Sequence, residues 1–360
     1  MRFPEFSGEW NKYTINDLAT VVGGGTPDTT VKSYWGGDIQ WFTPSEIGKN
    51  KYVDFSKRTI TRDGLDNSSA KLLPLHTILL SFRATVGECS IASNECTTNQ
   101  GFQSLIAKQC NIDFLYYLIQ TKKKDLIRNA CGSTFLEISA NEIRKIKVAV
   151  PVQNEQEQIA KLLSLIDERI ATQNKIIEKL QSLIKGLAAQ LTQSGTPNIR
   201  LCDCLECHSS TLQENCVSVT GSYPVYGATG LIGYTNNYAY NGESILIVKD
   251  GSGVGSLSYV NDHFSVIGTL NYLTAKENYS ILYLYYALMA FNFTPYITGM
   301  AIPHIYFKDY GKAKLFYPSI EKRIRIASLL HNIEQKLVVE QNLVISLSAQ
   351  KSYLLRMLFI

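Results

Sequence analysis

The 360-residue sequence has no apolar run approaching the ~20 residues that a membrane-spanning helix requires. Its longest candidate, Ile281 to Phe293, is too short and contains Asn292. The first residues, Met1 to Glu5, lack the apolar core of a signal peptide, so we expect a cytoplasmic protein without membrane contact. Because no export signal accompanies the eight cysteines, free thiols are expected rather than a disulfide framework.

Catalytic and cofactor motifs are also missing. No phosphate-binding G-x-x-x-x-G-K-[ST] sequence occurs, and the glycine-rich stretch Gly251 to Gly255 is not a dinucleotide fingerprint. Asn292 to Tyr296 lacks the double proline of the Asn-Pro-Pro-Tyr loop of adenine methyltransferases. The five histidines show no helical metal-ligand spacing. The lack of any catalytic constellation predicts a binding protein without metal or cofactor of its own.

One cysteine cluster allows two other interpretations. Cys204 to His208 fits the C-x-x-C-H pattern of covalent haem attachment, which requires export or a dedicated maturation site. With Cys202 and Cys216 a zinc site is also conceivable, but Cys202 and Cys204 are only two positions apart and no second ligand pair is evident. Incidental cysteines on an entry segment are the favoured interpretation.

What the sequence does contain is a long apolar helical pattern between Pro151 and Pro197. Asn154 with Glu157 three residues later is typical of a helix start, and Gly195 is a plausible stop. The pattern predicts a helix of roughly 39 residues and about 58 Å. Its heptad spacing requires a partner helix. The predicted coiled-coil positions are Leu163, Ile170, Ile177, Ile184 and Leu191.

An internal repeat supplies that partner. Pro151 recurs 167 positions later as Pro318, and several further identities keep the same offset without a gap. These are Gly132 with Gly299, Ile138 with Ile305, Ile159-Ala160 with Ile326-Ala327, Leu162-Leu163 with Leu329-Leu330, and Ile166 with Ile333. The repeat predicts a second long helix, about Glu321 to Leu358, packed antiparallel on the first with pseudo-twofold symmetry. Its coiled-coil positions are Leu330, Leu337, Val344 and Leu358.

The globular halves repeat more loosely, because Thr77 to Leu80 aligns with Ser244 to Ile247 while the loops differ. A preserved framework with divergent loops is what two binding modules of different specificity would have. The predicted fold is α+β, with two mixed α/β domains in tandem and two long antiparallel helices. The predicted domains are residues 1–150, a helix over 151–195, residues 196–317, and a helix over 318–360.

The net charge of +4 does not by itself indicate or exclude a polyanionic partner, since acidic residues on the helices can offset basic residues in the loops. The loops do combine lysine and arginine, which neutralise phosphates, with polar and aromatic side chains that can reach base edges. We expect at least half of these basic, polar and aromatic loop residues to be ordinary solvated charges or core tyrosines. The candidate DNA-binding residues are Trp41, Ser45, Lys49, Lys71, Arg83, Asn99, Gln100, Tyr226, Tyr234, Asn236, Lys249 and Lys308.

A further set of motifs is spread over essentially the whole chain. These are Arg2–Phe6, Trp10, Gly24–Pro27, Ile39–Trp41, Asn67–Pro74, Asn99–Gly101, Pro151, Glu155–Gln156, Ile159–Ala160, Ile166–Asp167, Tyr223–Gly227, Gly299, Pro303 and Ile305. Together they resemble the DNA-specificity subunit of Type I restriction-modification enzymes. One departure is that the pair Glu155-Gln156 becomes Lys322-Arg323 in the second repeat, where we expect an altered subunit contact.

The resemblance implies two target-recognition domains that each read half of a bipartite double-stranded DNA sequence. It also implies a coiled coil acting as a ruler for the spacer, and a rod of about 58 Å corresponds to roughly 17 base pairs. The helices would dock two methyltransferase subunits, joined by restriction subunits. S-adenosylmethionine, ATP and Mg²⁺ would then belong to those partners, and this chain would not be an enzyme by itself. The alternatives are an enzyme that cuts or methylates DNA alone, and a coiled-coil scaffold with two protein-binding heads.

Overall fold

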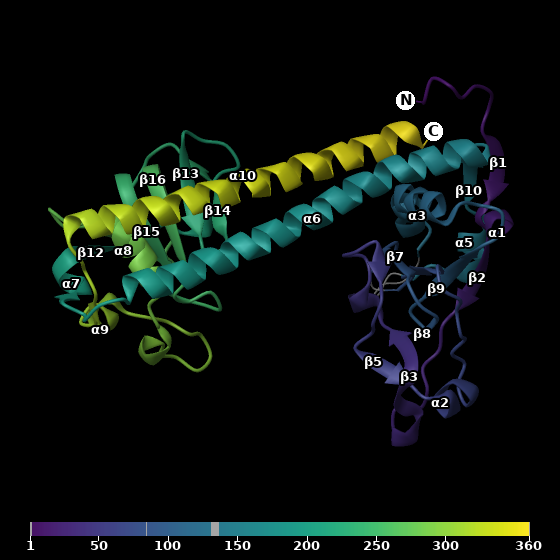
Figure 1. Ribbon diagram of the computed structural model, residues 1–360, viewed down its shortest axis with the longest axis horizontal. Helices are drawn as coiled ribbons and strands as arrows, with labels where there is room; N and C mark the ends of the chain where they lie inside the picture. The colour runs from purple at the N-terminus through teal and green to yellow at the C-terminus, as the bar shows by residue number, and fades with distance from the viewer. Residues whose placement is uncertain (1, 84, 131–136, 360) are drawn as a thin grey trace. The chain divides into compact units, whose positions relative to one another are not determined.

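The computed structural model describes residues 2–83, 85–130 and 137–359 (Figure 1). The chain forms two compact units, the first from residues 1–173 and 343–360 and the second from residues 174–342. The predicted long helices are confirmed as α6 (Gln153–Thr192, 40 residues) and α10 (Ile320–Leu358, 39 residues). The compact units divide the chain differently from the predicted domains, because each takes part of both helices. In the described ranges no helix is long and apolar enough to cross a membrane.

The described residues of the first unit form three sheets and five short α-helices besides its parts of α6 and α10. Its strands are β1 (Asn11–Thr14), β2 (Ala19–Gly23), β3 (Trp35–Phe42), β4 (Tyr52–Val53), β5 (Arg58–Ile60), β6 (Ile78–Leu80), β7 (Cys89–Ala92), β8 (Cys96–Thr98), β9 (Gln103–Ala107) and β10 (Lys147–Val150). Its short helices are α1 (Ile15–Leu18), α2 (Arg62–Asp66), α3 (Ile112–Thr121), α4 (Lys123–Arg128) and α5 (Ala140–Lys145).

The second unit has six strands in its main sheet and three short helices. Its strands are β11 (Ile199–Arg200), β12 (Leu205–Ser209), β13 (Tyr223–Gly227), β14 (Gly230–Thr235), β15 (Tyr240–Val248), β16 (Leu257–Val266), β17 (Leu270–Ala275) and β18 (Lys314–Leu315). Its short helices are α7 (Leu201–Cys204), α8 (Ile281–Met289) and α9 (Phe307–Tyr310).

The two main sheets have the same strand order. In the first unit it is β2-β9-β6-β7-β4, and in the second it is β12-β17-β15-β16-β13 with β14 added at the edge. In both, the first three pairings are antiparallel and the last is parallel. The tandem duplication read from the long helices therefore extends through the globular parts.

Each unit also has strands in addition to the five-stranded arrangement that the two units share. The first inserts a three-stranded sheet, β5-β3-β8, in which β3 pairs antiparallel with β5 and parallel with β8. The second instead extends its main sheet through the β13–β14 hairpin. The additions, and not the shared sheet, therefore distinguish the surfaces of the two units.

A short strand pair leads into each long helix. In the first unit β1 pairs with β10 just before α6, and the amide of Ile15 donates to the carbonyl of Ile146 at 3.0 Å. In the second, β11 pairs with β18 just before α10, and the amide of Leu201 donates to the carbonyl of Ala313 at 3.0 Å. The start of each globular part is therefore tied to the start of the helix that follows it.

The first unit's core joins α3 to both long helices. All side chains from Phe114 to Ile119 are buried, because α3 lies between the sheet and the helices. Leu163 near the start of α6 and Leu358 at the end of α10 belong to the same core. Within this unit the last turns of α10 lie beside the first turns of α6 (Figure 1), which is the antiparallel arrangement expected.

The second unit repeats that arrangement with the opposite halves of the helices. Ile184 and Ala188, late in α6, share a core with Ile326 and Leu330, early in α10. Leu163, Ile184, Leu330 and Leu358 are thus buried as predicted. The remaining predicted coiled-coil positions are partly buried: Ile170, Ile177, Leu191, Leu337 and Val344.

Candidate nucleic-acid interface

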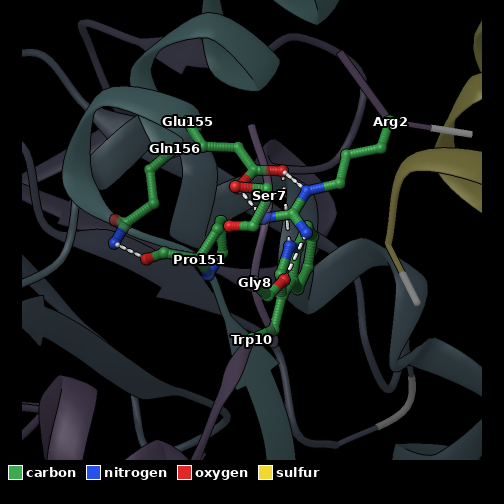
Figure 2. Close-up of polar contacts among 7 residues, drawn as sticks. All are labelled: Arg2, Ser7, Gly8, Trp10, Pro151, Glu155 and Gln156. Atoms are coloured by element: carbon green, nitrogen blue, oxygen red, sulfur yellow. Dashed lines mark hydrogen bonds and ion pairs between the residues drawn. The ribbon is translucent and has the colours of Figure 1, made fainter. Parts of the chain in front are cut away.

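The first turn of α6 anchors the start of the chain (Figure 2). Glu155 is fully buried, and its carboxylate accepts from Arg2 Nε at 2.8 Å, Arg2 Nη2 at 2.7 Å and the indole of Trp10 at 3.3 Å. This pairing raises the pKa of the Arg2 guanidinium. Gln156 donates to the carbonyl of Pro151 at 3.0 Å. The carboxylate of Glu155 is therefore occupied by donors from the first ten residues of the same chain. The altered subunit contact expected at Lys322-Arg323 stays a prediction.

The reversed charge at the second repeat is accommodated locally. Lys322 donates to the hydroxyl of Ser194 at 3.1 Å and lies 5.2 Å from the ring centroid of Phe316. Arg323 donates to the carbonyl of Pro318 at 2.6 Å, as Gln156 does to Pro151 in the first repeat. In both repeats a side chain of the first helical turn therefore donates to the carbonyl of the proline five residues earlier, although the charges of the two turns differ.

Tyrosines fasten each globular part to a long helix. Tyr117 of α3 donates to Asp167 at 2.7 Å in the first unit. Tyr285 and Tyr286 of α8 donate to Glu334 at 2.9 and 2.7 Å in the second. Burial, followed by the neighbouring carboxylate, raises the pKa of Tyr117 and Tyr285. The hydroxyls therefore stay protonated and act as donors that fix each sheet on its helix.

Sequence reasoning missed this pair of links, although a signal existed. Residues 115–117 and 284–286 both read Leu-Tyr-Tyr, and the acidic partners Asp167 and Glu334 are themselves equivalent repeat positions. The tyrosines lie two positions out of register with the helix repeat, so an ungapped comparison does not align them.

At one end of the three-stranded sheet of the first unit, three predicted residues come together. β3 and β8 run parallel with Phe42 opposite Thr98, so the segments that follow them emerge at the same end. Ser45 follows β3, and Asn99 and Gln100 follow β8. The side chains of Ser45 and Gln100 are exposed, and that of Asn99 is half-buried. This end of the sheet is the candidate interface of the first unit.

A glycine loop closes against the same sheet end. A Cβ on Gly24 would lie 2.0 Å from the carbonyl oxygen of Asn99, and one on Gly25 would lie 2.2 Å from the amide nitrogen of Ala70. Only glycine permits such close packing of backbone on backbone. The loop then places the Thr26 hydroxyl in hydrogen-bond contact with the side chain of Gln100.

The basic candidates of the first unit differ in their freedom. Lys49 and Lys71 are exposed and, among the described residues, form no ion pair or side-chain hydrogen bond. Arg83 is half-exposed and lies 3.7 Å from the carboxylate of Glu137.

The prediction that Trp41 contacts DNA requires a correction. Trp41 is 5% exposed and belongs to the core, so its indole cannot reach DNA directly.

In the second unit two predicted lysines line one hollow. Lys249 follows β15 and Lys308 lies on α9, and the hollow between them has a volume of about 560 Å³. The amide side chain of Asn271 and the hydroxyl of Ser209 add hydrogen-bonding groups, joined to each other at 3.0 Å. Lys249 and Lys308 supply two positive charges and Asp250 one negative charge, so the lining is net positive and suits an anionic ligand such as a phosphate. The full lining is Cys207, Ser209, Lys249, Asp250, Asn271, Ile305, Tyr306, Phe307 and Lys308.

The other candidates of the second unit lie on the hairpin that it adds. Tyr226 is on β13 and packs edge-to-face on Phe264, and burial raises its pKa. Tyr234 lies on the adjoining β14, and Asn236 is exposed just after that strand. None of these three residues belongs to the lining of the lysine-lined hollow.

The cysteine cluster is spread over separate environments. Cys204 is buried and Cys207 half-buried, and burial raises the pKa of these thiols to about 12 and about 11. His208 stacks on Tyr272 and shares a hydrogen bond of 2.9 Å with Thr274. All seven cysteines within the described ranges are free thiols. In the same ranges no three His, Cys, Asp or Glu side chains gather as metal ligands.

Comparison with known proteins assigns this arrangement to a family. The family described as "Type I restriction modification DNA specificity domain" matches residues 7–182 and 199–347. The specificity subunit of the Type I restriction enzyme EcoprrI from Escherichia coli is 25% identical over 91% of this chain and 87% of its own length. The MjaIX specificity subunit of Methanocaldococcus jannaschii is 39% identical over 48% of this chain, a segment covering only 42% of that relative.

Solved structures agree on the fold. The S subunit of a Type I restriction-modification system from M. genitalium superimposes with a TM-score of 0.65 at 19% identity, covering 100% of this chain and 99% of its own. A chain from a structure concerned with complex assembly and conformational transition of the type I R-M system gives 0.58 at 14% identity, over 99% and 98%. At these identities the likeness establishes the common architecture and nothing finer.

Proposed function

Because the chain belongs to the Type I restriction modification DNA specificity domain family, we propose that it binds a bipartite DNA sequence without catalysing a reaction itself. Each globular domain reads one half-site, and the spacer between the half-sites is not read. The observation that carries the proposal is the identical strand order of the two main sheets combined with different added elements. A shared scaffold that presents different surfaces suits two related but distinct DNA sequences.

The long helices set the spacing in this proposal. A helix of 40 residues is about 60 Å long, comparable to roughly 18 base pairs of DNA. The helices also dock two methyltransferase subunits, with which the restriction subunits assemble. S-adenosylmethionine, ATP and Mg²⁺ act in those partners. Support comes from apolar side chains left exposed on the helices: Leu165, Ile176, Leu183, Ile324, Val338 and Ile345.

A band-shift experiment with the full chain tests the proposal. The target is first selected from a DNA library with two randomised half-sites, with and without the methyltransferase partner. Scrambling either half-site of the selected duplex is expected to reduce affinity strongly, whereas changing only the spacer sequence has little effect. The same samples are assayed for DNA cleavage and methylation.

Two results would contradict the proposal. Absence of DNA affinity with or without the partner would favour a coiled-coil scaffold with two protein-binding heads. Turnover by the purified chain alone would identify it as an enzyme in its own right.

A further inference from the structure

The guanidinium of Arg58 lies flat on a tryptophan in the three-stranded sheet of the first unit. Its Cζ is 3.6 Å from the ring centroid of Trp35 and 5.5 Å from that of Trp41. The two indoles meet edge-to-face with centroids 5.0 Å apart. A guanidinium on an indole face is held by cation–π attraction, which fixes its plane.

The tryptophan platform is itself held in place. The indole of Trp41 donates to the carbonyl of Gly25 at 2.9 Å, and that of Trp35 donates to the carbonyl of Asp28 at 3.1 Å. Both acceptors belong to the glycine loop that closes on the sheet end. Two fixed rings therefore orient an arginine side chain that would otherwise sample many rotamers.

The edge of this guanidinium remains available. Within the described residues Arg58 is exposed and makes no side-chain hydrogen bond or ion pair. Arg62 and Arg83, by contrast, are paired with Asp66 and Glu137. Stacking covers the face of the guanidinium but leaves its in-plane N–H groups, which form a planar fork of donors.

Arg58 lies at the same end of the sheet as the candidate interface. It stands opposite Trp41 on β3, one residue before the end of that strand. The amide of the preceding residue, Lys57, donates at 2.6 Å to Glu46, the neighbour of Ser45. The fork therefore belongs to the polar surface formed by the residues that follow β3 and β8.

We propose that Arg58 determines specificity by reading a guanine in the half-site bound by the first domain, with two N–H groups donating to O6 and N7. The inference rests on the proposed function. A phosphate is bound adequately by a flexible lysine, whereas bidentate recognition of a base edge needs a planar fork held at one angle. Because the three-stranded sheet is an addition of the first unit, the guanine belongs to that unit's half-site only.

Selection from a library with both half-sites randomised tests this with the full chain. Wild type is expected to yield two half-site motifs. Arg58→Lys, which keeps the charge but loses the fork, should reduce the preference for guanine at one position by roughly 10- to 100-fold. Other positions and the second half-site should stay unchanged. Arg62→Lys, an exposed arginine four residues away, is the matched control and should leave both motifs intact.

A second variant separates the reading of the base from loss of structure. Trp35→Phe retains the guanidinium on a weaker platform and should relax the same guanine position. Near-ultraviolet circular dichroism follows the paired indoles in Arg58→Lys and confirms that the sheet is folded. An unchanged motif in Arg58→Lys, or an equal loss of affinity for all sequences, would overturn the inference and leave the proposed function standing. Absence of any motif with wild type would overturn both.

Discussion

At the scale of single residues, equivalent repeat positions can carry opposite charges without changing the local structure. Glu155 is buried and paired with Arg2 from the start of the chain. Its counterpart Lys322 rests on Phe316 and bonds to Ser194. A buried carboxylate requires compensating donors, and the chain that precedes each helix supplies a different partner. The charge at this position is therefore matched to its own unit.

The tyrosine links allow a stability prediction for the second unit. Tyr286 is fully buried and donates to Glu334, so Tyr286→Phe removes a hydrogen bond to a charged acceptor. We expect the free energy of unfolding, measured in urea, to fall by about 1.5–3 kcal/mol. The control is Tyr238→Phe, since Tyr238 is 48% exposed and its hydroxyl bonds to none of the described residues. Equal effects of the two substitutions would show that the link contributes nothing.

At the scale of elements, the two long helices contain the regularly spaced apolar residues of the chain. Their buried and partly buried positions together recur every three to four residues, from Ile159 and Leu163 to Ile184 and Ala188 on α6. The first unit buries the start of α6 together with the end of α10, and the second buries the end of α6 together with the start of α10. Helix length is therefore linked to both cores, and a change in one helix alone would place its apolar positions out of register.

Lengthening both helices together should alter the DNA spacer. Inserting one heptad into α6 and one into α10 keeps the apolar register and adds about 10 Å, equivalent to roughly 3 base pairs. Sequencing of the sites selected by the variant should show unchanged half-sites with a longer spacer. In the control variant, one native heptad of each helix is replaced by the heptad sequence used for the insertion, so the length of both helices stays unchanged. An unchanged spacer in the insertion variant would refute the role of the helices as a ruler.

At the scale of the whole molecule, the chain is one scaffold used twice with different surfaces. The common five-strand order supports a glycine loop and a three-stranded sheet in one unit, and a hairpin and a lysine-lined hollow in the other. Recognition of each half-site should therefore respond independently to substitutions in its own unit.

The hollow of the second unit makes that independence measurable. Replacing Lys249 and Lys308 together by alanine should reduce the slope of log affinity against log salt concentration by about 1.8, since each phosphate contact contributes about 0.9. The motif of the first half-site should not change. The control replaces Lys179 and Lys185, two exposed lysines on α6, so the net charge falls equally. A salt-dependence slope equal to that of wild type would show that the hollow does not contact DNA phosphates.

The sequence by itself determined the features that repeat or are periodic. The helix over Gln153–Thr192, its copy near the end of the chain, and the tandem organisation all follow from apolar spacing and from an ungapped offset. These signals are local, because helix burial recurs with a fixed period whatever the rest of the chain does. The sequence also predicts Ser45, Asn99 and Gln100 as polar candidates, whereas their position at one end of the same sheet follows from the pairing of β3 with β8.

Only the tertiary structure decided which groups meet. The sequence predicts Trp41 as a DNA contact, yet its indole is buried in the core. Arg58, directly opposite on the paired strand, stacks on Trp35 and keeps its edge free. Glu155 pairs with Arg2, which lies 153 positions earlier in the sequence. Such pairings join positions far apart along the chain, and no local pattern encodes them. The long helix between Pro151 and Pro197 could be predicted from the sequence. The contacts that its side chains make with other parts of the chain could not.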